Sequence, residues 1–183
     1  LTSNVVWSAD YYIGRDAYDS GDYATALREF KPLAEQGDAD AQSILGWMYR
    51  KGHGVPQDDK TAVKWYILAA EQGDSSAQSN LGFMYRNGIV VIQNYKTALK
   101  WFRLAAEEGS SLGQANMGSM YEDGLGVIQD NIYAHMWANI SASNGNEYGV
   151  ELRDRVAKNM TSADISKAQN LARECVAKNY KGC

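Results

Sequence analysis

The side chains that most often carry out chemistry are scarce in this sequence, whose 183 residues include two histidines and two cysteines. His53 stands in a glycine-rich stretch and His135 in an apolar one, and neither has cysteine or acidic residues at metal-site spacing. His135 occupies the position that Leu27, Val63 and Leu99 hold elsewhere in the chain. This favours a histidine packed between helices with its hydrogen bonds satisfied, not a metal ligand or a catalytic base.

Two glycine pairs, Gly52-His-Gly54 and Gly124-Leu-Gly126, invite comparison with phosphate-binding loops. Each pair follows a predicted helix and lacks the Gly-Lys-Ser/Thr sequence, so that interpretation fails. The carboxylates near them, such as Asp58, are typical of helix N-termini and solvated surfaces. We find no nucleophile–base set and no Ser-x-x-Lys acylation motif with its partners. The sequence therefore predicts a protein that is not an enzyme, with no catalytic residue, metal or cofactor.

The two cysteines, Cys175 and Cys183, lie eight residues apart. On one continuous helix they would be about 12 Å apart, too far to bond. Gly182 and the unpatterned residues before it would let the chain fold back, and a disulfide would then add about 2–3 kcal/mol. An even cysteine count is consistent with an oxidising compartment. Two unrelated thiols in a cytosolic chain are the alternative.

Composition excludes several classes of function. The chain is 45% hydrophobic and 22% charged, which is typical of soluble globular proteins. A net charge of −4 and a pI near 5.2 argue against a nucleic-acid partner. No apolar run approaches the roughly 20 residues of a transmembrane segment. The chain begins at Leu1 with no signal-peptide pattern, so either a signal peptide has been removed or the sequence was trimmed.

Glycines, alanines and aromatic residues recur at one interval along the chain. Gly46, Gly82 and Gly118 are 36 residues apart. The same step separates Tyr49, Tyr85 and Tyr121; Gly52, Gly88 and Gly124; Ala62, Ala98 and Ala134; Trp65, Trp101 and Trp137; and Gly37, Gly73, Gly109 and Gly145. A fixed period of this size indicates a solenoid of stacked repeats.

Each repeat is predicted to contain two helices joined by a turn. Before the turn and again after it, apolar residues recur at the spacing of one face of a helix. The segment between them, residues 51–58, is rich in residues that form turns. A glycine inside a helix costs about 1 kcal/mol relative to alanine. Three such glycines at one register predict a close approach of the two helices, with an aromatic ring filling the space of the missing Cβ. We therefore predict an all-α, right-handed α-α solenoid of about ten helices in stacked antiparallel pairs, with a concave inner surface.

The period also divides the chain, which we interpret as one repeat domain over 1–183. The first unit, 1–38, has a shorter turn than the repeats 39–74, 75–110 and 111–146. The remaining residues, 147–183, are predicted to form capping helices, the last beginning at Thr161 or Ser162 and ending near Tyr180.

The pattern Ala-x-x-x-Leu-Gly-x-x-Tyr-x-x-Gly-x-Gly-Val-x-x-Asp, followed by Ala-x-x-Trp-Tyr-x-x-Ala-Ala-x-x-Gly, covers Ala41–Gly73. It resembles the Sel-one-like repeat family, relatives of the tetratricopeptide repeats with a longer internal loop. The first unit is more similar to an ordinary tetratricopeptide repeat, through Gly21-Asp22-Tyr23. Two residues depart from the pattern. Val90 replaces the second loop glycine, so we expect a differently shaped loop, and Ala138 replaces the aromatic residue.

The resemblance implies a binding surface, because in tetratricopeptide folds the first helix of each pair lines the concave groove. The corresponding positions here are Tyr11, Arg15, Tyr18 and Asp19; Ser43, Trp47, Arg50 and Lys51; Ser79, Phe83, Arg86 and Asn87; and Ala115, Ser119, Glu122 and Asp123. We expect Trp47 and Phe83 to anchor a ligand and Arg50 and Arg86 to pair with its acidic groups. The alternative is that these aromatic rings only pack against neighbouring helices.

The family also implies a class of function: a non-catalytic scaffold or adaptor that binds a protein or peptide. By analogy with its relatives the protein is expected to be bacterial and periplasmic or secreted, with a cytoplasmic location as the alternative. A binder of glycans or peptidoglycan fragments is a second hypothesis, since groove aromatics could stack on sugars. A third hypothesis is a β-lactam-binding or β-lactam-hydrolysing enzyme, since some cysteine-rich relatives have been linked to penicillin binding and weak β-lactam hydrolysis. Those relatives join the two helices of each repeat through cysteines eight residues apart, a spacing found here only at Cys175 and Cys183.

Overall fold

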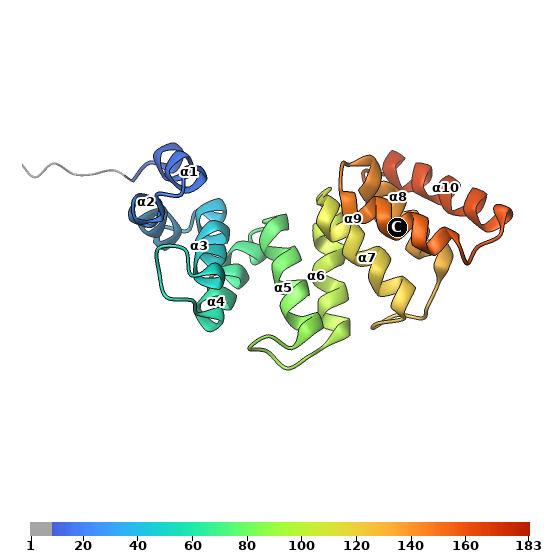
Figure 1. The fold of residues 1–183 in the computed structure, drawn as a ribbon, viewed down its shortest axis with the longest axis horizontal. Coiled ribbons are helices and arrows are strands. Elements are labelled where there is room, and N and C mark those ends of the chain that lie inside the picture. The colour runs from blue at the N-terminus through green and yellow to red at the C-terminus, as the bar shows by residue number, and fades with distance from the viewer. Residues whose placement is uncertain (1–8) are drawn as a thin grey trace, which may run out of the picture. The chain divides into compact units, whose positions relative to one another are not determined.

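A computed structural model describes residues 9–183, and the first eight residues of the predicted first unit lie outside this range. The described residues form ten helices and no strand (Figure 1). The helices are α1 (Tyr11–Asp19), α2 (Tyr23–Glu35), α3 (Ala39–Lys51), α4 (Asp59–Glu71), α5 (Ser75–Asn87), α6 (Tyr95–Glu107), α7 (Ser111–Asp123), α8 (Asn131–Ser143), α9 (Glu147–Ala157) and α10 (Ser162–Ala177). The all-α class predicted from the 36-residue period is confirmed.

The helix ends repeat because the capping residues repeat. The side chains of Asp38, Asp74 and Ser110 each accept a hydrogen bond from the backbone N–H three residues later, at the start of α3, α5 and α7. The same three helices end at Gly52, Gly88 and Gly124, whose φ angles are 72°, 67° and 65°. Only glycine adopts this left-handed conformation without steric cost, so the caps fix where each repeat turns.

The glycines inside the first helices are sites of close approach, as predicted. A Cβ on Gly46 would lie 2.8 Å from the ring of Tyr66, and one on Gly82 would lie 2.5 Å from the ring of Phe102. Gly118 differs, because Ala138 offers no ring. There a Cβ would meet Leu152 of α9 at 2.9 Å and the carbonyl oxygen of Ala134 at 3.0 Å, so the next helix fills the space.

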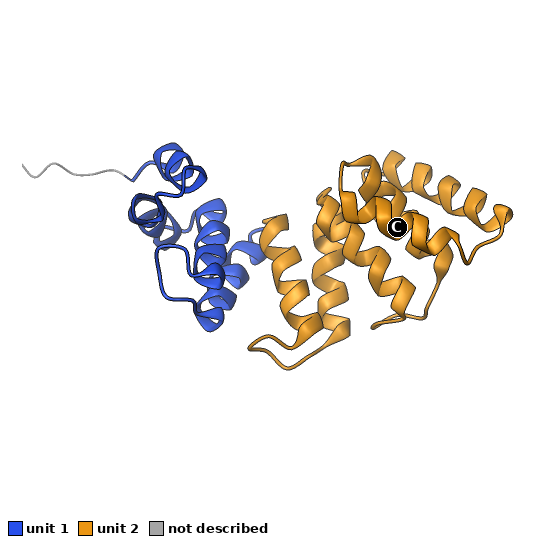
Figure 2. Cartoon of the chain, viewed as in Figure 1, with its two compact units in different colours: residues 1–72 blue, residues 73–183 orange. Residues whose placement is uncertain are grey.

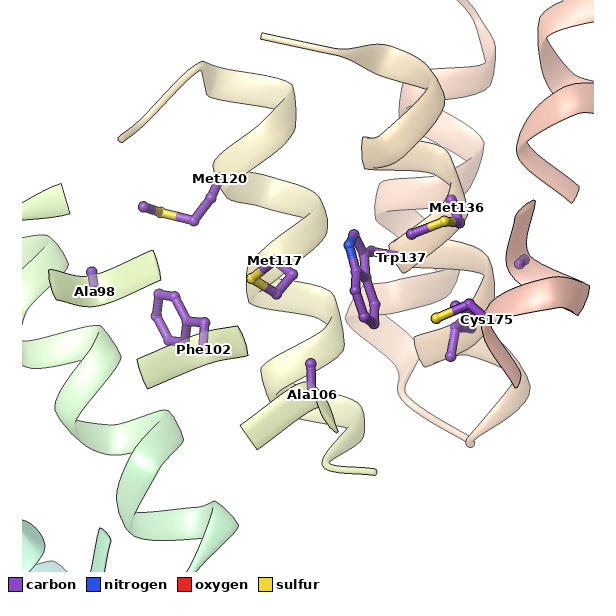
Figure 3. Close-up of a cluster of buried hydrophobic side chains, with 10 residues drawn as sticks. Ala98, Phe102, Ala106, Met117, Met120, Met136, Trp137 and Cys175 are labelled. Atoms are coloured by element: carbon purple, nitrogen blue, oxygen red, sulfur yellow. The ribbon is translucent and has the colours of Figure 1, made fainter. Parts of the chain in front are cut away.

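The chain divides into two compact units, residues 1–72 and 73–183 (Figure 2). The first contains α1–α4, around a core that includes Phe30, Leu45 and Met48. The second contains α5–α10, and its core joins Phe102 of α6, Met117 of α7 and Trp137 of α8 to the end of α10 (Figure 3). We describe each unit by itself.

The last helix begins as predicted but ends earlier, at Ala177 and not near Tyr180. Thr161, not Ser162, is the N-cap of α10, and it forms a capping box with Asp164. Helix α10 ends at Ala177 and packs on α8, where Ala172 and Cys175 contribute to the core of the second unit.

The expectation that Val90 would change the shape of its loop is wrong. Gly88 and Val90 have φ angles of 67° and 64°, close to 72° and 72° at Gly52 and Gly54. The loop therefore keeps the backbone of the other repeats, and a β-branched residue occupies a left-handed conformation that such residues avoid.

We predict that Val90→Gly raises the free energy of unfolding by about 1 kcal/mol, because it relieves this backbone strain. Urea denaturation should show a higher midpoint with an unchanged slope. Val91→Gly is the control: its φ is not positive, and the glycine should destabilise by about 0.5–1 kcal/mol. Equal effects of the two substitutions would contradict the strain at Val90.

His135 is packed between helices as predicted, but its hydrogen bonds are not all satisfied. The side chain is 3% exposed on α8, and its Nδ1 has no hydrogen-bond partner among the described residues. Burial lowers the pKa of His135 below its usual value, as does the charge of Arg153, while Asp154 opposes the shift. The folded state therefore favours the neutral ring.

This lowered pKa predicts a pH dependence of stability. The unfolded chain takes up a proton on this ring near pH 6.5, whereas the folded chain resists it. The free energy of unfolding should therefore fall as the pH drops below about 6.5, by at most about 1.4 kcal/mol per pH unit. His135→Leu should lose this part of the dependence, which urea titrations at pH 5 and pH 7.5 would measure. An identical pH profile in the variant would contradict the prediction.

Candidate binding site

In the first unit, Trp47 of α3 is half-buried, and two cations lie near its ring. The Nζ atom of Lys51 is 4.7 Å from the centroid of the indole ring, and the Cζ atom of Arg50 is 5.7 Å from it. Cations at these distances are attracted to the face of an aromatic ring. Burial raises the pKa of Tyr18, and its contact with Trp47 partly opposes that rise, so Tyr18 of α1 lies beside the indole.

The loop between α3 and α4 is attached to this surface by His53. The ring of His53 stacks on Tyr23 with centroids 4.1 Å apart, and its Nδ1 lies 3.2 Å from the hydroxyl oxygen of Tyr18. The sequence analysis placed His53 in a loop and missed this role. The signal was Tyr23, the first residue of α2, which follows the short turn of the first unit.

The other predicted positions of α1 are divided between packing and solvent. Tyr11 is half-buried, and its ring meets Phe30 edge-on at 5.6 Å. Its pKa is raised by burial and then by the charge of Asp40. Arg15 and Asp19 are exposed and form an ion pair with each other at 3.1 Å, one helical turn apart.

In the second unit, charged groups at predicted groove positions pair within the chain. Arg86 of α5 contacts Asp123 of α7, with Nη2 3.2 Å from Oδ2. Glu122 of α7 accepts two hydrogen bonds from Arg155 of α9, at 2.9 and 2.6 Å. These bonds raise the pKa of Arg155 well above its usual value. Ion pairs therefore connect α5 to α7 and α7 to α9.

Phe83 of α5 is 37% exposed. Its neighbour Asn87 is exposed, and the Asn87 side chain donates a hydrogen bond of 2.8 Å to the carbonyl oxygen of Phe83. Phe83 thus keeps an accessible face in the second unit, as Trp47 does in the first.

Four predicted groove residues are not on an accessible surface. Ser43 is 8% exposed, Ser79 is 1%, Ala115 is 0% and Ser119 is 2%. The hydroxyl of Ser79 instead donates a hydrogen bond to the carbonyl oxygen of Ser75. Its oxygen also lies 3.3 Å from the hydroxyl oxygen of Ser110. These positions face neighbouring helices, and small residues stand there because there is little space.

The structure also shows a buried polar contact that the sequence analysis missed. The side chain of Gln42 donates to the carbonyl of Ala34 at 3.0 Å and accepts from Gln72 at 2.8 Å. Gln114 makes the same pair of bonds, donating to Ala106 at 3.4 Å and accepting from Asn144 at 2.8 Å. The signal was present, since glutamine recurs every 36 residues at 42, 78 and 114. Each of these two side chains connects a first helix to the preceding second helix.

A cavity of about 310 Å³ opens between α8 and α10 in the second unit. It is lined by Asn139, Ile140, Ser143, Ala172, Arg173 and Val176. Nowhere in residues 9–183 do three His, Cys, Asp or Glu side chains gather in a way that could hold a metal ion. Within the same range, no helix is both long and apolar enough to span a bilayer.

Repeated helix pairs with the same capping pattern define a helical repeat protein. Three consecutive segments, residues 39–74, 75–110 and 111–146, match the Sel1 repeat. The chain belongs to this family, which is the Sel-one-like family of the sequence analysis. Sel1 repeat proteins are generally protein-interaction scaffolds.

The solved structures similar to this chain include two repeat proteins. A Sel1 repeat protein from Oxalobacter formigenes is 35% identical, with a TM-score of 0.64 over 71% of this chain and 98% of that one. The protein c5321, a protective antigen of uropathogenic Escherichia coli strains with an SLR fold, is 27% identical with a TM-score of 0.58. That match covers 85% of this chain and 42% of c5321. No curated protein sequence matched.

We predict that Gln114→Ala lowers the free energy of unfolding by about 2 kcal/mol, because it removes two hydrogen bonds made by a fully buried side chain. Gln129→Ala is the matched control, since its side chain also donates to a carbonyl, that of Glu122, but is exposed. The control should change stability by less than about 0.5 kcal/mol. Comparable losses in the two variants, measured by urea denaturation, would show that the buried contact is not important.

Proposed function

We propose that this chain is a non-catalytic adaptor that holds a peptide, or an extended segment of a partner protein, on the face of α1 and α3 that is predicted to line the concave groove. The observation that carries the proposal is the half-buried indole of Trp47 with Lys51 and Arg50 near its ring. Tryptophan and arginine dominate binding energy at protein interfaces. A ring already held by its neighbours also loses little freedom when a ligand covers it.

The chemistry of this surface favours an acidic ligand. Lys51 is exposed, and Arg50 lies beside the same ring, so a carboxylate close to an apolar side chain of the ligand would meet a cation. Arg86 is less suited to this role because Asp123 already occupies its guanidinium. In the second unit we propose Phe83 and Asn87 as ligand contacts, with Arg86 and Glu122 holding the helices that present them.

A glycan ligand is a second candidate, favoured by Tyr18 next to Trp47, since two neighbouring aromatic rings could stack on a sugar. We also propose that the protein is periplasmic or secreted. Support comes from the Cys175–Cys183 disulfide, because disulfides persist mainly in oxidising compartments.

The test is a library of short peptides, with and without acidic residues, presented to the whole chain. Peptides with a carboxylate next to an apolar side chain should be enriched. Trp47→Ala with Arg50→Ala should weaken their binding about 30-fold or more, as expected for a hot spot. Circular dichroism of the double variant should show unchanged helix content, because both residues lie at the surface.

Trp101→Ala is the matched control. Trp101 is also half-buried next to a cation, with Lys100 Nζ 5.8 Å from its ring, but it lies on a second helix, α6. The Trp101→Ala substitution should leave peptide binding unchanged. Undiminished binding by the double variant would refute the placement of the site. Binding of muropeptides in preference to peptides would support the glycan candidate, and turnover of a chromogenic β-lactam would contradict the non-catalytic assignment.

A further inference from the structure

The last six residues, 178–183, fold back along the second unit instead of extending α10. A disulfide joins Cys175, inside α10, to Cys183, the last residue, with their Cα atoms 5.6 Å apart. The loop between them contains three left-handed residues, Asn179, Tyr180 and Gly182, with φ angles of 50°, 65° and 68°. Two of these are not glycine, so the loop carries backbone strain that persists only where the surroundings enforce it.

The loop reaches the ends of two other helices. The hydroxyl of Tyr180 accepts a hydrogen bond of 3.3 Å from Asn144, directly after α8. The Tyr180 ring packs beside Gly109 in the turn between α6 and α7, where a Cβ would lie 3.5 Å from it. Lys181 forms an ion pair with Glu108 in the same turn, at 2.7 Å. Both partners of that pair are 54% exposed, so water screens it and it holds the loop weakly.

The end of α10 covers apolar surface of α8. Cys175 is 2% exposed and belongs to the same buried cluster as Met136 and Ile140 (Figure 3). The cavity between α8 and α10 begins at this contact, since Ile140 and Val176 line it. Anything that loosens the end of α10 therefore uncovers Ile140 and opens this cavity.

We propose that the Cys175–Cys183 disulfide is a reducible latch that holds the end of α10 on α8. The noncovalent contacts of the loop are weak, because its backbone is strained and its ion pair is exposed. The covalent bond therefore keeps the loop in place against the second unit. The reductant is a dithiol. Its thiolate attacks Sγ of Cys183, which is half-exposed, and Cys175 leaves as a thiolate that takes up a proton. The second thiol of the reductant then displaces Cys183, so two electrons and two protons pass from the dithiol to the cysteines.

Hydrogen–deuterium exchange of the whole chain, oxidised and after treatment with dithiothreitol under native conditions, tests the latch. On reduction, amides of residues 170–183 and of the facing end of α8 should exchange at least about ten-fold faster, as expected for local opening. Helices α1–α7 should be unchanged. Cys183→Ser, without reductant, should reproduce the pattern of the reduced protein.

Lys181→Ala separates the bond from the contacts around it. This variant loses the ion pair with Glu108 but keeps the disulfide, and its oxidised form should exchange like the wild type. Three results would overturn the proposal: equal exchange in the oxidised and reduced proteins, faster exchange throughout α5–α10 on reduction, or a disulfide that dithiothreitol reduces only after unfolding. A Lys181→Ala variant as open as the reduced protein would also overturn it, because the ion pair would then be the latch.

Discussion

The structure depends on how closely the two helices of a repeat approach each other at one glycine. At Gly46 and Gly82 the missing Cβ is replaced by the ring of Tyr66 or Phe102, which lies where a side-chain atom would collide. The glycine weakens its own helix by about 1 kcal/mol, but the ring it admits is fully buried and returns about 1.5–3 kcal/mol. Once this distance is fixed, the caps at both ends of each helix determine the rest of the repeat.

Exposed positions of the first helices vary between repeats, and the two units use this variation differently. The first unit presents an indole beside two cations. In the second unit, acidic and basic residues at the groove positions pair between neighbouring helices, Arg86 with Asp123 and Glu122 with Arg155. One repeat architecture therefore supports a surface suited to a charged ligand in the first unit and a self-paired one in the second.

The regular contacts change where the repeats end. The ring that faces Gly46 and Gly82 is absent opposite Gly118, and Leu152 of α9 takes its place. Helix α10 then packs on α8, with its end tied down by the disulfide loop. A stack that is open at its end exposes apolar surface, so its last helices must be held by contacts that the repeat itself does not supply.

The sequence by itself determined the period, the helix pairs, the caps and the close approach at the glycines. These features depend on contacts within one helix or on residue types that recur at one register, and both are visible in a linear pattern. It also placed Trp47 and Phe83 at candidate ligand-binding positions, with packing against neighbouring helices as the alternative. Only the tertiary structure decided that Ser43, Ser79 and Ser119 are buried and that Arg86 pairs with an acidic residue of the same chain. It also decided that Val90 adopts the backbone conformation of the glycines at its register and that Nδ1 of His135 has no hydrogen-bond partner among the described residues. Each of these depends on the distance and rotation between helices that are separate in sequence, and residue spacing does not specify these quantities.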